Sequence, residues 1–143
     1  MIKDKKGLTL IEVMVALVVL LIVFLGMMQA IAVAVNMNVK NQLRGEGVRV
    51  ADERVNALKN LSFGNADLND TGGVFINDNY IDPNTGINTN IITRSFRNFD
   101  MNFTSTKRIT DINADNKRIE LTVSWTWRNE TFNHGVSLVL KRP

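Results

Sequence analysis

The most distinctive pattern along this chain is a long apolar stretch close to its N-terminus. From Val13 to Met28 no side chain is charged or polar, and after the single Gln29 the apolar residues continue to Val35. Residues 8–35 are therefore long enough to span the roughly 30 Å of bilayer hydrocarbon as a helix. The sequence predicts a transmembrane helix here, with one acidic residue, Glu12, close to its start.

Helical spacing of apolar residues continues beyond this stretch. As far as Leu61, apolar residues recur at intervals of three to five and most charged residues fall on other sides of the helix. One helix over residues 8–61 would be about 80 Å long at 1.5 Å per residue. Gly26, Gly45 and Gly47 are its expected weak points, because each costs up to about 1 kcal/mol relative to alanine.

Residues 62–90 are rich in asparagine, aspartate, glycine and threonine, with turn signals at residues 71–73 and 82–86. We expect a long loop that connects the helix to a sheet, or that also serves as a recognition surface. The oxygen-rich stretch 78–88 is compatible with calcium by composition. Its spacing does not follow the known Ca²⁺ loop pattern, so no metal ligand is predicted.

The C-terminal third alternates apolar and polar residues, which is the period of a half-buried β-strand. Residues 119–127 alternate, residues 128–131 break the pattern and residues 132–140 resume it, which predicts an antiparallel hairpin. One or two earlier strands are expected between Ile91 and Phe103, with a turn at residues 113–116. The predicted fold class is α+β, a long N-terminal helix packed on a three- or four-stranded antiparallel sheet within residues 91–143.

Composition and the placement of charges indicate how the chain is oriented in a membrane. The chain has 143 residues, enough for one domain and an anchor. Lys3, Lys5 and Lys6 precede the apolar stretch and a long polar region follows it, which predicts a cytoplasmic N-terminus and an exported C-terminal domain. Cysteine is absent, which excludes a disulfide framework and cysteine chemistry.

Glu12 is the residue that most needs an explanation, because a carboxylate costs on the order of 3 kcal/mol at the centre of a membrane helix and less near the interface. A plain single-pass anchor would hold it at the level of the headgroups. A secretory signal peptide is a second interpretation, with Ala30-Ile31-Ala32 as its cleavage candidate. An acid at the start of the apolar run has no purpose in a discarded peptide.

The residues Gly7-Leu8-Thr9-Leu10-Ile11-Glu12 follow a short basic leader and precede an apolar helix. This arrangement resembles the cleavage and methylation signal of type IV prepilins and of the related type II secretion pseudopilins. The resemblance implies a pilin fold, cleavage by a prepilin peptidase after Gly7, loss of the leader 1–7, and methylation of the new N-terminus at Leu8. The family most often has phenylalanine as its first mature residue, where this chain has Leu8.

The resemblance also implies that Leu8, Thr9 and Glu12 form the segment that acts in subunit assembly. In the family's filament, the amine of an incoming subunit meets the glutamate of a neighbour. A new α-amino group on Leu8 has a reference pKa of about 7.7 to 8 and is positive at neutral pH. It would therefore pair with Glu12 of another subunit, because a buried charge is tolerable when it is paired.

A second resemblance covers residues 50–63, 123–128 and 136–138, which look like PilV-type minor pilins. The I-type minor pseudopilins of type II secretion are similar and remain an alternative. The resemblance implies a subunit held in the inner membrane, with residues 36–143 in the periplasm, and later in the pilus fibre or at the cell surface. The implied partners are the prepilin peptidase, the major pilin and other minor pilins, the inner-membrane assembly platform and a pilus-tip adhesin.

Signs of catalysis are missing from the sequence. His134 is the only histidine, no base accompanies a serine or threonine nucleophile, and no glycine-rich phosphate loop opens a helix. Nucleic-acid binding is the rival activity, because Trp125 and Trp127 beside Arg128 could stack bases. Both tryptophans share the apolar side of their strand, which favours burial. We expect a structural protein with no cofactor, and neither an enzyme nor a nucleic-acid-binding protein.

Overall fold

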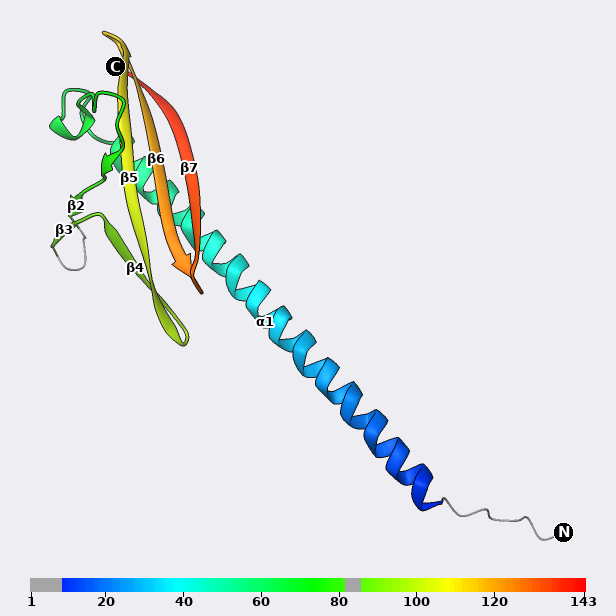
Figure 1. Ribbon diagram of the computed structural model, residues 1–143. Coiled ribbons are helices and arrows are strands. Elements are labelled where there is room, and N and C mark those ends of the chain that lie inside the picture. The colour runs from blue at the N-terminus through cyan, green and yellow to red at the C-terminus, as the bar shows by residue number, and fades with distance from the viewer. Residues whose placement is uncertain (1–8, 82–85) are drawn as a thin grey trace. The chain divides into compact units, whose positions relative to one another are not determined.

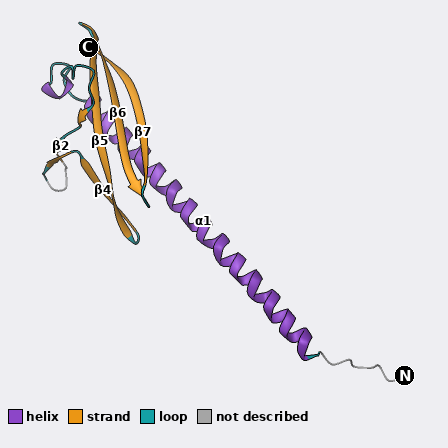
Figure 2. Ribbon diagram, viewed as in Figure 1, coloured by secondary structure: helices purple, strands orange, loops and turns teal. Residues whose placement is uncertain are grey.

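The computed structural model describes residues 9–81 and 86–143 (Figure 1). The chain divides into two units, Met1–Asn41 and Gln42–Pro143. Among the described residues, one long helix is followed by a short 3₁₀ turn and by strands, which Figure 2 separates by colour. The predicted α+β class, a long N-terminal helix with an antiparallel sheet, is confirmed.

The helix α1 extends over Leu10–Lys59, within the range 8–61 that the sequence predicted. From Leu10 to Met37 the large apolar side chains of α1 are exposed, from 48% for Val13 to 80% for Leu10. In the second unit its buried residues follow helical spacing and form one stripe: Leu43, Gly47, Val50, Ala51, Arg54, Val55 and Leu58. Only the second part of α1 therefore contributes to a protein core.

The second unit contains an antiparallel sheet in the order β1-β5-β6-β7, with β4 also paired to β5. Its strands are β1 (Ile76–Asn77), β4 (Ile91–Phe96), β5 (Phe99–Asn113), β6 (Asn116–Trp127) and β7 (Glu130–Lys141). The predicted hairpin of residues 119–140 is confirmed as β6 and β7. The sheet has five strands and not three or four, because the short β1 joins it from the loop. A separate pair, β2 (Tyr80–Ile81) and β3 (Asn88–Thr89), lies in the same loop.

Strand β5 continues well past Phe103, where the apolar alternation of the sequence ends. Ser105 and Lys107 take the next inward-facing positions of β5, and both are buried. Because these inward positions carry polar side chains, period-two hydrophobicity alone does not reveal this part of the strand. The pairing Ile109↔Ile119 restores apolar contact on the same face.

The core lies between the second part of α1 and the inner face of β5 and β6. It includes Phe103, Ile109, Ile119, Leu121 and Val123, all at most 1% exposed. Trp125 packs directly on the helix at Gly47, where a Cβ atom would lie 2.5 Å from the indole ring. Gly47 is therefore also a close-packing position, a role that the sequence interpretation did not give it.

Charged residues also connect α1 to the β4–β5 hairpin. Arg94 on β4 forms ion pairs with Glu46, at 3.0 Å, and with Glu53. Arg49 pairs with Glu53 along the helix at 3.3 Å. These contacts orient the hairpin on α1, although exposed pairs of this kind contribute only about 0 to 1 kcal/mol each.

Candidate functional site

The candidate site at the N-terminus is organised by Thr9 and Glu12. The backbone amide and the hydroxyl of Thr9 both donate to Oε2 of Glu12, each at 2.9 Å. The amide of Glu12 in turn donates to the Thr9 hydroxyl at 3.3 Å. This reciprocal arrangement is a capping box, which satisfies amides that have no partner within the helix. Two of the predicted assembly residues are thus brought together at the start of α1.

The capping role of Thr9 was missed in the sequence interpretation, although the spacing Thr-x-x-Glu before an apolar run is its known signal. The acid in the first turn is also favoured by the positive end of the helix dipole. Glu12 therefore has a partner within its own chain. The predicted cleavage site, Gly7 and Leu8, and the predicted methylation site, Leu8, lie outside the described residues.

The surface that follows Glu12 is apolar on every side. Within the described residues, α1 is the helix that is long and apolar enough to cross a membrane, and none of its most apolar window is buried. Exposed apolar surface of this extent is rare on monomeric soluble proteins and marks a contact with lipid or with other proteins. By its length and composition, this helix is consistent with the predicted membrane-spanning segment.

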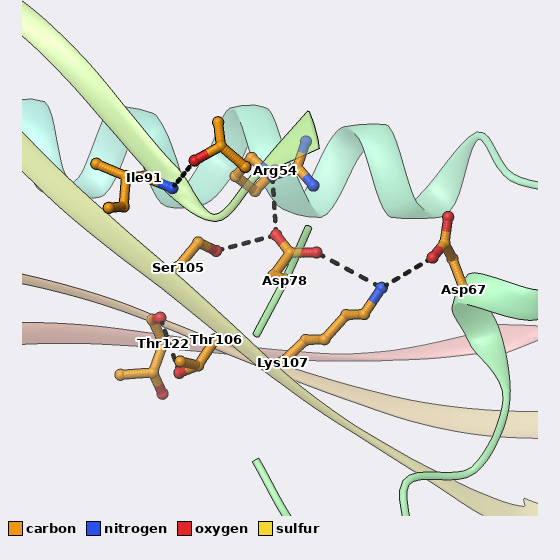
Figure 3. A network of polar contacts seen from close by, with 9 residues as sticks. Arg54, Asp67, Asp78, Ile91, Ser105, Thr106, Lys107 and Thr122 are labelled. Atoms are coloured by element: carbon orange, nitrogen blue, oxygen red, sulfur yellow. Dashed lines mark hydrogen bonds and ion pairs between the residues drawn. The ribbon is translucent and has the colours of Figure 1, made fainter. Parts of the chain in front are cut away.

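A buried polar network holds the loop after α1 against the helix and the sheet of the second unit (Figure 3). Asp78 is completely buried, and its Oδ2 accepts hydrogen bonds from Arg54 Nε at 2.8 Å and from Ser105 Oγ at 2.9 Å. Lys107 Nζ lies 3.7 Å from Asp78 Oδ1 and 3.5 Å from Asp67 Oδ1. These residues come from α1, the loop and β5, so the network joins three parts of the unit.

A second buried lysine fixes the loop nearby. Lys117 on β6 donates to the carbonyl of Leu68 at 2.7 Å and pairs with Asp111 at 3.2 Å. In a chain without cysteine, these charge-assisted contacts take the place of a covalent link between loop and sheet. Asp78, the first residue of the stretch compatible with calcium, is committed to Arg54 and Lys107.

The tryptophans do not form a joint stacking surface. Trp125 is 4% exposed and packs against Gly47 and Phe103. Trp127 is half-buried, with its ring centroid 5.1 Å from that of Phe99. The predicted burial is thus confirmed for Trp125 and is partial for Trp127. His134 is half-buried on β7.

The comparison with protein families gives one result, the prokaryotic N-terminal methylation motif, over residues 2–28. No curated protein and no solved structure matches the chain. The motif includes Gly7, Leu8, Thr9 and Glu12, and it ends inside the exposed apolar part of α1.

Together, the motif and the fold define a class of protein, a precursor with an N-terminal methylation signal on an apolar helix. They support assignment of the chain to the type IV pilin and pseudopilin family. The motif implies processing by a prepilin peptidase and assembly with other pilins. The apolar helix and the motif indicate a membrane-anchored pilin precursor.

Proposed function

We propose that the chain is a structural minor pilin of the PilV type. It is cleaved after Gly7, methylated on Leu8, and held in the inner membrane with residues 36–143 in the periplasm. It is then incorporated into a type IV pilus or primes its assembly. The observation that carries the proposal is the coincidence, at one helix start, of the methylation motif, the carboxylate of Glu12 and an exposed apolar helix.

The geometry of Glu12 suits a contact with a neighbouring subunit. The bonds from Thr9 all engage Oε2, and Oε1 takes no part in them. Hydrogen bonds from Thr9 lower the cost of carrying the charge in an apolar environment, and the amine of a neighbour's Leu8 would neutralise it. Because an unpaired buried charge is costly, the pair would act as a check on axial register.

The first experiment determines the N-terminus of the mature protein by mass spectrometry in cells with an active prepilin peptidase. The proposal predicts a chain that begins at Leu8 with one added methyl group. Gly7→Val should leave the leader in place, because cleavage depends on the glycine. A mature start at Val33, or an uncut Met1, would show a signal peptide or a plain anchor.

The second experiment separates the charge of Glu12 from its capping role. Glu12→Gln keeps a capping box, since glutamine serves at this position, but it removes the charge. Thr9→Val removes the hydroxyl of the cap, with its two hydrogen bonds, and keeps the charge. We expect Glu12→Gln and Glu12→Ala to enter the membrane normally and to lose incorporation into pili, while Thr9→Val retains most of it. Normal incorporation of Glu12→Gln, with loss of incorporation in Thr9→Val and Glu12→Ala, would assign Glu12 to helix capping alone.

The alternative is an I-type minor pseudopilin of a type II secretion system, which shares the same N-terminal chemistry. Complementation distinguishes the two, because a minor pilin restores pili in a deletion strain and a pseudopilin restores secretion. We propose a structural role in either case and no catalytic activity, since the sequence offers no nucleophile with a base.

A further inference from the structure

Strand β7 (Glu130–Lys141) forms one edge of the sheet (Figure 1). Within residues 9–81 and 86–143 it pairs with β6 alone, and this pairing continues from Trp127↔Glu130 to Asn116↔Lys141 without a bulge. At 12 residues, β7 is about twice as long as a typical strand. Its outer side therefore presents a long, regular row of main-chain groups that no strand of the described residues meets.

The hairpin turn before β7 determines which of these groups face outwards. Arg128 and Asn129 both have positive φ, at 49° and 65°, and form a two-residue turn closed by the pair Trp127↔Glu130. The closing pair of such a turn exchanges both of its hydrogen bonds, and bonded pairs alternate with non-bonded pairs from there on. The main-chain amide and carbonyl therefore point away from β6 at every second residue of β7, and these residues are all exposed. They are Thr131, Asn133, Gly135, Ser137, Val139 and Lys141.

The opposite edge of the sheet carries features that prevent further pairing. There, β1 has only 2 residues and β4 only 6, and short edge strands offer little to a partner. On β4, Arg94 faces inwards beside Met101 and forms ion pairs with Glu46 and Glu53. An inward charge on an edge strand is a second such feature. Strand β7 has neither of them, because it is long and residues 131–140 include no proline, lysine, arginine, aspartate or glutamate.

Gly135 lies at the centre of the outward-facing residues of β7. The strand register is regular there, the φ of Gly135 is not positive, and a Cβ atom would have its nearest neighbours 3.9 Å away. The fold of the chain therefore has room for a side chain and does not require glycine. A glycine inside a strand weakens it, and where no bulge or bend explains the residue it marks a place where another backbone approaches closely. Apart from its chain neighbours, only Leu121 and Thr122 of the described residues come within 4 Å of that position.

The inner face of β7 is only partly covered. On β6, Trp125 and Leu121 are at most 4% exposed. Their cross-strand neighbours on β7 are Phe132 and Val136, which are only half-buried. The core therefore covers β6 more completely than β7. A strand added beside β7 would bring its own side chains next to Phe132 and Val136 and complete their burial.

We propose that β7 accepts an extended strand of a different pilin subunit, which pairs with it antiparallel and continues the sheet. The inference rests on the proposed function and names the surface through which this subunit meets a neighbour. The outward amides and carbonyls of β7 supply the hydrogen bonds of such a contact, and alternate side chains of the partner strand give its specificity.

The described residues also define the chemistry of the partner strand. The strands of this sheet all pair antiparallel, and β7 begins at Glu130 and ends at Lys141. A complementary partner is therefore basic where its strand ends, beside Glu130, and acidic where it begins, beside Lys141. Between these ends its inner side is apolar, to match Phe132 and Val136, and its outer side fits the space at Gly135. Because the methylation motif implies assembly with other pilins, we assign the strand to a pilin subunit.

The first test is photo-crosslinking of the full chain in cells that assemble the fibre. A benzophenone amino acid replaces Ser137 on the open edge or, as the matched control, Arg118, which is exposed on the outer face of β6. An added strand lies about 5 Å from β7 and about 10 Å from β6. We expect position 137 to give several-fold more crosslinked product than position 118. The partner in that product, identified by mass spectrometry, should carry its own N-terminal methylation motif.

The second test asks whether main-chain pairing makes the contact, and it repeats the crosslinking from position 137 in three variants. Gly135→Thr has room for its side chain and gains strand propensity, so its Tm should be at or above the wild-type value while its product falls several-fold. Asn133→Pro removes an outward amide that β6 does not use, which an edge strand tolerates, and its product should also fall several-fold. The matched control Asn133→Thr keeps that amide and should retain the wild-type amount of product.

Equal crosslinking at positions 137 and 118 would place the partner on the outer face of the sheet and overturn the edge contact. Unchanged product in both Gly135→Thr and Asn133→Pro would refute strand pairing, and a product between two copies of this chain would overturn the proposal in favour of self-association. No product at position 137, with the wild-type chain present in the fibre, would refute the contact and leave the proposed function intact. Absence of the wild-type chain from the fibre, or an uncut N-terminus, would contradict the proposed function itself.

Discussion

Gly47 and Gly45 lie two residues apart on α1 and are predicted to respond to alanine in opposite directions. A Cβ atom at position 47 would lie 2.5, 2.8 and 3.1 Å from three atoms of the Trp125 ring, and a Cβ atom at position 45 would have nothing within 4 Å. Both substitutions gain helix propensity, by up to about 1 kcal/mol. Only Gly47→Ala adds an overlap inside the core.

Inserting a methyl group into a well-packed core typically costs about 1 to 3 kcal/mol. Distances under 3 Å to a rigid indole place Gly47→Ala at the upper end of that range, so its net effect is a loss of about 1 to 2 kcal/mol. Gly45→Ala should gain up to about 1 kcal/mol. For a domain near 100 residues, 1 kcal/mol shifts Tm by about 4 to 8 °C, so the two variants should melt on either side of the wild type.

The assay is thermal unfolding of the full chain in detergent, followed by near-UV circular dichroism, which reports on the tryptophan environment. A double-mutant cycle isolates the contact, because the three clashing atoms belong to the six-membered ring of Trp125 and phenylalanine lacks them. In a Trp125→Phe background, Gly47→Ala should lose most of its cost. A Gly47→Ala variant that melts at or above the wild-type temperature would refute the reasoning.

Other predictions follow from the polar contacts. Asp78→Asn leaves the buried Arg54 without its carboxylate partner, removes one of the two carboxylates that face Lys107, and should lower the unfolding free energy by about 3 to 5 kcal/mol. Asp67→Asn, at an exposed carboxylate, should cost no more than about 1 kcal/mol. Urea unfolding measures both, and equal losses would contradict the central place of Asp78. Backbone amides of Gly72 and Asp111 donate to Asp70, and Arg108 donates to Glu120, and these bonds hold the pKa of both carboxyls below their usual values. Such groups stabilise the fold above the unfolded-state pKa, and that contribution is lost as pH falls through the lower folded-state pKa. Tm should therefore fall in acid, and Asp70→Asn and Glu120→Gln should each flatten that fall; a pH profile parallel to the wild type would count against these contacts.

The amino-acid sequence determined the features that depend on neighbours along the chain. A continuous apolar run fixes a helix of membrane-spanning length, the spacing of Val50, Val55 and Leu58 continues it, and period-two alternation fixes β6 and β7. The N-terminal motif could be read in the same way, because Gly7, Leu8 and Glu12 are close in sequence. These patterns depend on local geometry, which repeats with a fixed period.

Tertiary structure decided the features that depend on contacts between residues far apart along the chain. Ser105 and Lys107 interrupt the hydrophobic pattern of β5. Both are nevertheless buried, because Asp78 of the loop accepts a hydrogen bond from Ser105 and forms an ion pair with Lys107. From the sequence alone, Gly47 only weakens the helix. In the structure, its missing side chain lets the Trp125 ring pack against the helix backbone. The rings of Phe99 and Trp127, which lie on strands of two different hairpins, come into contact only when the sheet has formed. No local period records such contacts, since burial and charge pairing are set by what lies opposite in space.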